Sequence, residues 1–313
     1  MVDYLDIEDR NKDYQYVHSQ TVRAEIGIRA IGLVYHDHSP DVDSFDNVFR
    51  LKDNIEYRLF SASHQYLILL RELGLAEKSL QDLYKRNIGY LDSNTFPTGN
   101  PYFDQVETEL SSIFDSIIFH LSSVFDYLSH SICYMFFENK QETLYWTRLV
   151  KKVRSDFKDK FGFCEVFNEV DKRFVGRLYD YRSRLLHNKR DRHKFNTRIY
   201  LEQELAFDLK ISCSDVSLKH FSLINSDNPE NKTITLAYMA SWLLKRSFKE
   251  IENILDAIKI DLEKNSNFLN VQKKGLMPLI VNQETHFAEP SSNIFWQEYK
   301  GKAEKQATPA KDV

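Results

Sequence analysis

The chain has 313 residues, of which 42% are hydrophobic and 28% are charged, and its formal net charge is −4. These proportions exclude a disordered chain, and the length leaves room for one to three domains with a sizeable core. Only 9 glycines and 7 prolines interrupt long amphipathic stretches, which favours a mainly helical fold. No apolar run approaches the roughly 20 residues of a membrane span, and the acidic start of the chain lacks a signal-peptide pattern. We therefore expect a soluble, cytoplasmic protein with no membrane partner.

Cysteine and histidine spacing gives no indication of a metal site. Cys133, Cys164 and Cys213 are too far apart to form a CxxC pair, so neither structural zinc nor a disulfide framework is predicted. His36 and His38 form an HxH pair, which binds metal on some strands, but the Ser-Pro dipeptide that follows favours an ordinary turn. We therefore predict no metal and no cofactor.

The first part of the chain is predicted to form an N-terminal helical extension over residues 1–95. Residues 23–35 fit either a short helix or a strand. Apolar side chains at helical spacing predict a helix over residues 51–74, ending at a glycine, and a second, shorter helix over 76–90. Two prolines, a glycine and several turn-forming residues predict a linker over residues 91–101.

Residues 102–264 are predicted to contain four long helices. Apolar residues recur every three or four positions along each of them, as in a helix that packs against a core. Short connections between the early helices indicate antiparallel neighbours in a bundle. The predicted helices cover residues 102–137, 142–160, 164–187 and 233–263.

Asp126 and His130 lie four residues apart on the first of these helices. At that spacing the two side chains share one face, so they could pair or border a site. A surface position or a helix-capping role is the more ordinary explanation of the same spacing.

The apolar pattern changes to alternation between the third and fourth helices. Residues 206–212 and 216–223 both alternate apolar and polar side chains, which predicts two half-exposed strands joined by a turn at 213–215. We therefore expect a small β-hairpin at about 205–224. Residues 265–313 are polar and are expected to form an irregular segment and tail.

Positive charge is concentrated in one part of the sequence. Residues 148–198 contain 16 Lys/Arg and 7 Asp/Glu, a net of +9 that leaves −13 for the remainder. A basic segment on an acidic body suggests contact with a polyanion, although a solvated helical surface gives the same pattern. Within this segment, Arg182 and His187 near the end of the third helix are the one constellation that suggests chemistry.

Arg182 and His187 carry the groups needed to cleave RNA without a metal. The imidazole can take a proton from a ribose 2′-hydroxyl and return one to the leaving oxygen, while the guanidinium stabilises charge on the phosphate. On an ideal helix their spacing turns the side chains roughly 140° apart, so they converge only if the helix is distorted or a second subunit contributes. Asp180 shares the face of His187 and could orient the imidazole, or it could pair with Arg184. The structural alternative is that these cations interact with the helix dipole.

A helical bundle whose third helix ends in Arg182-Ser-Arg-Leu-Leu-His187 resembles the HEPN superfamily. Tyr181, Asn188 and the sequence FHLSSVFDYLSH at residues 119–130 add to the similarity, which covers about half of the chain, residues 102–263. The resemblance implies a mainly α fold, namely an antiparallel four-helix HEPN-like bundle with the small hairpin inserted between its third and fourth helices. It also implies a metal-independent endoribonuclease in a toxin or anti-phage setting.

The resemblance also assigns roles by position. Arg182 would stabilise the phosphate and His187 would be the acid and base. Ser183 stands where the family more often has Asn, Asp or His. Family members usually form homodimers in which two motifs face each other, which implies RNA, a second copy and an antitoxin or defence-system protein as partners. Other members have lost activity and bind only RNA or a protein, which is the alternative function. Beside the resemblance, their positions near the pair make Asp180, Ser183, Arg184 and Asn188 candidates to support the site. The candidate RNA contacts in the basic run that follows, which could instead be simply solvated, are Lys189, Arg190, Arg192, His193 and Lys194.

Overall fold

Most of the residues that the computed structural model describes are helical, so the predicted mainly α fold is confirmed. Within that described part of the chain, three small two-stranded sheets accompany the helices. The structure describes residues 4–38, 42–86, 101–137, 144–158, 160–187, 193–200, 206–221, 232–264, 279–281 and 288–307.

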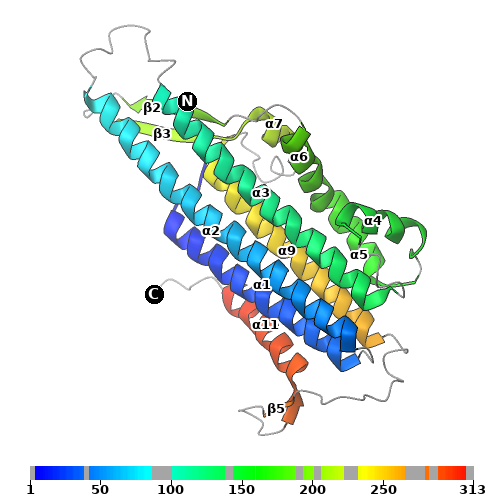
Figure 1. Ribbon diagram of the computed structural model, residues 1–313. Coiled ribbons are helices and arrows are strands. Elements are labelled where there is room, and N and C mark those ends of the chain that lie inside the picture. The colour runs from blue at the N-terminus through cyan, green and yellow to red at the C-terminus, as the bar shows by residue number, and fades with distance from the viewer. Residues whose placement is uncertain are drawn as a thin grey trace. The chain divides into compact units, whose positions relative to one another are not determined.

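Four long helices make up most of the fold (Figure 1). The helix predicted at residues 102–137 is present as α3. The last helix of the predicted bundle is present as α9, which starts three residues later and ends one residue later than predicted. Residues 23–35 lie inside α1, so the helical alternative is correct for them. The HxH pair also lies in α1, and the expected turn there is wrong. The long helices are α1 (Arg10–His38), α2 (Val42–Arg86), α3 (Pro101–Phe136) and α9 (Leu236–Lys264).

Helix α2 continues through Gly74, where a stop was predicted. A glycine inside a helix costs only about 1 kcal/mol relative to alanine. The neighbouring Leu73 and Ala76 are almost fully buried, and their burial outweighs that cost. The two helices expected at residues 51–74 and 76–90 are therefore one helix, and the predicted linker falls almost wholly outside the described residues.

The third helix of the predicted bundle is present as three consecutive pieces that end at His187. These are α5 (Phe163–Val170), a π-helical turn η2 (Asp171–Val175) and α6 (Gly176–His187). The second predicted helix is shorter than expected, because the buried apolar side chains of α4 (Trp146–Ser155) end at Val153.

A β-hairpin precedes α9, but its strands differ from those predicted. The strand at residues 206–212 is present as β3 (Ala206–Ser212), and it pairs antiparallel with β2 (Lys194–Tyr200). The predicted partner at residues 216–223 is wrong, because α7 (Asp215–His220) begins there. The hydroxyl of Ser214 accepts a hydrogen bond from the Ser217 amide at 3.0 Å, and such an N-cap favours a helix over a turn.

The C-terminal part contains regular structure where an irregular segment is expected. Strands β5 (Leu279–Val281) and β6 (Ala288–Pro290) pair, and α11 (Ser291–Ala307) follows them. Arg23 of α1 donates from Nε to the Tyr299 carbonyl at 3.2 Å and lies over its ring at 4.8 Å. Because these contacts join residues 276 positions apart, composition alone could not reveal the helix.

The chain divides into two compact units. Each long helix contributes residues to both units. Unit 1 therefore combines segments of the predicted domains 1–95 and 102–264, and unit 2 combines segments of these two and of 265–313. The predicted division into three domains stays a prediction. Arg182 and His187 belong to unit 1. Unit 1 consists of Met1–Val17, Ser61–His120 and Arg177–Leu244, and unit 2 of His18–Phe60, Leu121–Gly176 and Lys245–Val313.

Candidate functional site

The inner face of α6 in unit 1 is fixed by two buried side chains, Leu178 and Tyr181. The Tyr181 ring lies 5.1 Å from the ring of Phe221, which directly follows α7. His220 of α7 donates from Nε2 to the Arg177 carbonyl oxygen at 2.8 Å. These contacts hold α6 beside α7 (Figure 1), and most residues in the last turns of α6 are exposed.

The predicted catalytic residues occupy the last turns of α6. Arg182 is half-buried, and its guanidinium carbon lies 5.8 Å from the centre of the Tyr179 ring. His187 is exposed and is the last residue of the helix. The π-helical distortion lies before Gly176, so the α-helical segment from Gly176 to His187 keeps the two side chains roughly 140° apart. Within one chain the structure therefore does not bring them together.

The other predicted residues of α6 are placed at its surface. Asp180, Ser183 and Arg184 are all exposed, and their supporting role stays a prediction. Leu186, which was not predicted to take part, is 57% exposed directly before His187. The sequence could have indicated this residue, because it is an apolar side chain that lies between the arginine and the histidine of the motif. Asn188, Lys189, Arg190 and Arg192 lie outside the described residues.

His193 does not fit its predicted role as an RNA contact. Its side chain is fully buried, and its ring packs edge-on against Phe114 at 5.0 Å. Its Nδ1 accepts a hydrogen bond from the Ser214 backbone amide at 3.2 Å. The imidazole therefore helps to place the start of α7 and cannot reach a phosphate in this structure. Lys194, the next residue, begins β2 opposite Ser212.

A buried polar network joins three helices elsewhere in unit 1. Asp13 of α1 accepts hydrogen bonds from the hydroxyls of Tyr66 of α2 and Ser241 of α9, at 2.6 and 2.7 Å. Burial and the Asp13 carboxylate raise the pKa of Tyr66 well above its usual range, so the phenol stays a hydrogen-bond donor. Because Tyr66 is fully buried, this network is structural.

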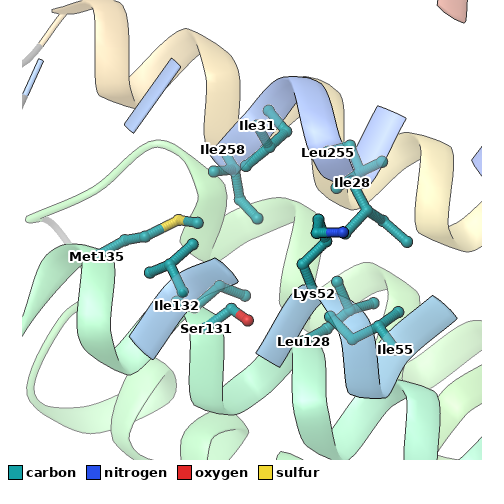
Figure 2. A pocket seen from close by; sticks show the side chains of 11 residues that line it. Ile28, Ile31, Lys52, Ile55, Leu128, Ser131, Ile132, Met135, Leu255 and Ile258 are labelled. Atoms are coloured by element: carbon teal, nitrogen blue, oxygen red, sulfur yellow. The ribbon is translucent and has the colours of Figure 1, made fainter. Parts of the chain in front are cut away.

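In unit 2, side chains from α1, α2, α3 and α9 surround a small apolar cavity of about 20 Å³ (Figure 2). That volume holds about one water molecule. Lys52 extends its methylene groups along the cavity while Nζ pairs with Asp53 at 2.7 Å and Glu56 at 3.1 Å. Burial alone would lower the pKa of Lys52, but these hydrogen bonds outweigh it and raise the pKa. The amine is therefore held as an ammonium ion, which is not a nucleophile.

A larger groove of about 460 Å³ lies between α5, η2 and α9 in unit 2. Its charged residues have mixed signs, so the groove does not favour ions of one charge. Asp261 accepts a hydrogen bond from the Phe163 amide at 2.6 Å and thereby caps α5. The charged residues that line the groove are Glu169, Arg173, Asp256, Asp261 and Lys264.

The described residues contain no group of three or more His, Cys, Asp or Glu side chains that could hold a metal ion. In the same part of the chain, no helix is both long and apolar enough to cross a membrane. Comparisons with models of known protein families, with curated proteins and with solved structures give no match, so the HEPN resemblance depends on the motif of α6 and on the helical architecture.

Proposed function

We propose that the chain is a homodimeric, metal-independent endoribonuclease of the HEPN type. The observation that carries this proposal is the position of Arg182 and His187 on the last turns of α6, with the histidine exposed and the arginine half-buried. Leu178 and Tyr181 fix the helix from its inner side, so the pair is presented on a rigid element. Such presentation is what general acid–base chemistry on a phosphodiester requires.

The proposal needs two subunits because one helix cannot point both side chains at the same phosphate. In a two-fold contact between the ends of two α6 helices, Arg182 of one protomer would face His187 of the other. The exposed Leu186 supports this arrangement, since an apolar side chain beside the histidine would lose its water contact in the seam. Each dimer would contain two equivalent composite sites.

In each site the neutral His187 imidazole accepts the proton of the ribose 2′-hydroxyl, and the 2′-oxygen forms a bond to phosphorus. The bond from phosphorus to the 5′-oxygen breaks, and that oxygen receives a proton from the imidazolium. Arg182 donates hydrogen bonds to the phosphate oxygens, where negative charge increases in the transition state. The products are a 2′,3′-cyclic phosphate and a 5′-hydroxyl end.

We expect His187→Ala to lower RNA cleavage by at least about 100-fold, because it removes the proton-transfer group. Circular dichroism and light scattering should show an unchanged fold and an unchanged dimer. Cleavage by the wild type should persist in EDTA, and mass spectrometry should find cyclic phosphate ends. His64→Ala is the matched control, because His64 is an exposed histidine on α2 and should be dispensable. Full activity of His187→Ala would rule the mechanism out.

The alternative is a HEPN module that binds RNA or a protein without cleaving. That function predicts salt-dependent RNA binding by the wild type with no turnover under any metal condition. The proposed nuclease would act in a toxin or defence setting. In that setting the wild type should slow bacterial growth when it is expressed alone, and His187→Ala should not.

A further inference from the structure

Helix α4 in unit 2 has one apolar and one strongly basic face. Trp146, Leu149, Val150 and Val153 are buried. Arg148, Lys151 and Arg154 are exposed on the remaining surface of the helix, and the helix contains no acidic residue. Arg154 is engaged locally, because it pairs with Asp171 at 2.7 Å and with Asn168 at 2.9 Å. Arg148 and Lys151, about one turn apart, therefore form the outward cationic edge of α4.

Tyr145 adds an exposed aromatic ring at the N-terminal end of this edge. It is 56% exposed, whereas its neighbours Leu144 and Trp146 are 3% and 0% exposed, so the chain turns this one side chain outward. Its ring packs against the ring of His130 on α3, with centroids 5.0 Å apart and an interplanar angle of 60°. The Tyr145 ring is thus supported from one side and accessible from the other.

The start of α4 is fixed to α3, which sets the position of Tyr145. The carboxylate of Asp126 accepts a hydrogen bond from the Trp146 amide at 3.2 Å, so of the two ordinary roles expected for Asp126 the capping role is correct. The surface position is wrong, because the residue is only 8% exposed. The indole of Trp146 stacks on Phe167 at 5.0 Å and donates to Asp171 at 2.9 Å. Tyr145 is therefore held on a rigid base, and little conformational entropy is lost when a ligand contacts it.

We propose that Tyr145, Arg148 and Lys151 form a binding surface for single-stranded RNA. We name these three residues the α4 strip. One unpaired base stacks on the open face of Tyr145, and the adjoining phosphates contact Arg148 and Lys151, about 5 to 9 Å further along the helix. This inference rests on the proposed function, because it takes RNA as the ligand; it adds that the RNA is single-stranded and that residues other than the catalytic pair contact it.

The chemistry of the α4 strip favours an unpaired strand over other polyanions. In duplex RNA the bases are stacked on each other, so an exposed protein ring finds no free base, and recognition uses phosphates and 2′-hydroxyls. An acidic peptide would use the two cations but would gain nothing specific from a ring that accepts a flat base. The combination of one ring and two cations is the arrangement of single-strand binding sites.

The test uses the full chain with His187→Ala, so that binding is measured without turnover. The probe is a single-stranded RNA that carries the fluorescent base 2-aminopurine, whose emission falls when it stacks. Tyr145→Ala should weaken binding about tenfold and remove the fluorescence change, and Tyr145→Phe should retain both. The combined change Arg148→Ala and Lys151→Ala should lower the salt slope of log K by about 1.4, for two phosphate contacts.

Matched controls separate the α4 strip from general surface effects. Tyr57→Ala removes a 64% exposed tyrosine of unit 2, and Lys78→Ala removes an exposed lysine of α2. Neither change should alter affinity or fluorescence. A duplex of the same sequence should bind more weakly than the single strand. An acidic peptide should not displace the single-stranded RNA from the protein.

Wild-type affinity and fluorescence in Tyr145→Ala would overturn this proposal, and so would equal binding of duplex and single strand. Effective displacement by the acidic peptide would assign the surface to a protein instead. The outcomes distinguish the two proposals. If the wild type cleaves RNA and Tyr145→Ala leaves binding and fluorescence unchanged, only the proposal for the α4 strip is wrong. If the base stacks on Tyr145 but the wild type cleaves no RNA, only the nuclease proposal is wrong.

Discussion

His130 shows how one partly buried side chain gives the fold a dependence on pH. Burial lowers the pKa of His130, and the nearby Asp126 opposes this shift only in part. The folded protein therefore binds this proton less tightly than the unfolded chain does. Stability contributed by the neutral ring is complete above the ordinary histidine pKa of about 6.5, and it is lost as the pH falls through the lower folded value.

We expect His130→Phe to flatten the acid side of the stability profile. The phenylalanine ring preserves contact with Tyr145 and has no proton to gain, so urea midpoints should fall less between about pH 6.5 and pH 4.5 than in the wild type. His64→Phe changes an exposed histidine of α2 and should leave the wild-type profile as it is. Parallel profiles for His130→Phe and the wild type would show that this imidazole does not govern the acid sensitivity.

The π-helical turn η2 connects two elements, because it contains Arg173, whose side chain contacts α9. Arg173 donates from Nε to the Glu250 carboxylate at 2.9 Å, and Arg246 lies 2.8 Å from the same group. Asn253 donates to it at 3.0 Å. The Glu250 side chain is fully buried, so these three neighbours replace the contacts with water that it loses on folding. A π turn at this point sets the direction of Arg173 without ending the helix.

We expect Glu250→Ala to lower the free energy of unfolding by about 2 kcal/mol. Removal of a fully buried partner would cost about 3–5 kcal/mol, but both arginines are about one-third exposed and water screens them. Denaturation in urea measures the change. Glu263→Ala on the same helix is the control, because its pair with Lys259 is solvent-exposed and should contribute less than about 1 kcal/mol. Equal losses in the two variants would contradict the buried-carboxylate account.

The spacing of apolar residues correctly predicted the helices with long, regular apolar stripes. It gave wrong predictions where contacts between residues distant in the sequence determine the secondary structure or the burial of a side chain. The stripe of α3 and the charged last turns of α6 could be recognised from their spacing alone. The segment after Ser214 alternates like a strand, yet a serine cap starts a helix there. His193 belongs to a basic run, but its ring is buried against Phe114 of α3. No spacing rule reports that contact, because the two residues are far apart in the sequence.

At the scale of the whole molecule, the proposed nuclease is a pair of chains that share each site. Arg182→Ala and His187→Ala should each be inactive, because every site of either homodimer lacks one group. A heterodimer of the two variants has one site with both groups intact. Co-expression of equal amounts should therefore restore roughly a quarter of wild-type cleavage, since half of the dimers are mixed and each has one functional site.

Separate affinity tags on the two variants allow the mixed dimers to be isolated, and their cleavage should approach half of the wild-type rate. Two wild-type subunits with the same tags give the reference rate. Persistent inactivity of isolated heterodimers would mean that each chain builds its own site, and the shared arrangement would be wrong.

The interleaving of the two units has a consequence for synthesis on the ribosome. Strand β1 (Tyr4–Leu5) pairs with β4 (Thr233–Ile234), and the Thr235 hydroxyl donates a hydrogen bond to the Asp6 carboxylate at 2.6 Å. The first residues of unit 1 can therefore make these contacts only after residues 233–235 have been synthesised. Unit 2 likewise needs Lys245 and the residues beyond it. Neither unit can close around a nascent chain that stops before about residue 235. Translation must therefore pass about residue 235 before unit 1 is sealed and residue 245 before unit 2 is sealed, and chaperones can engage the exposed helices until then.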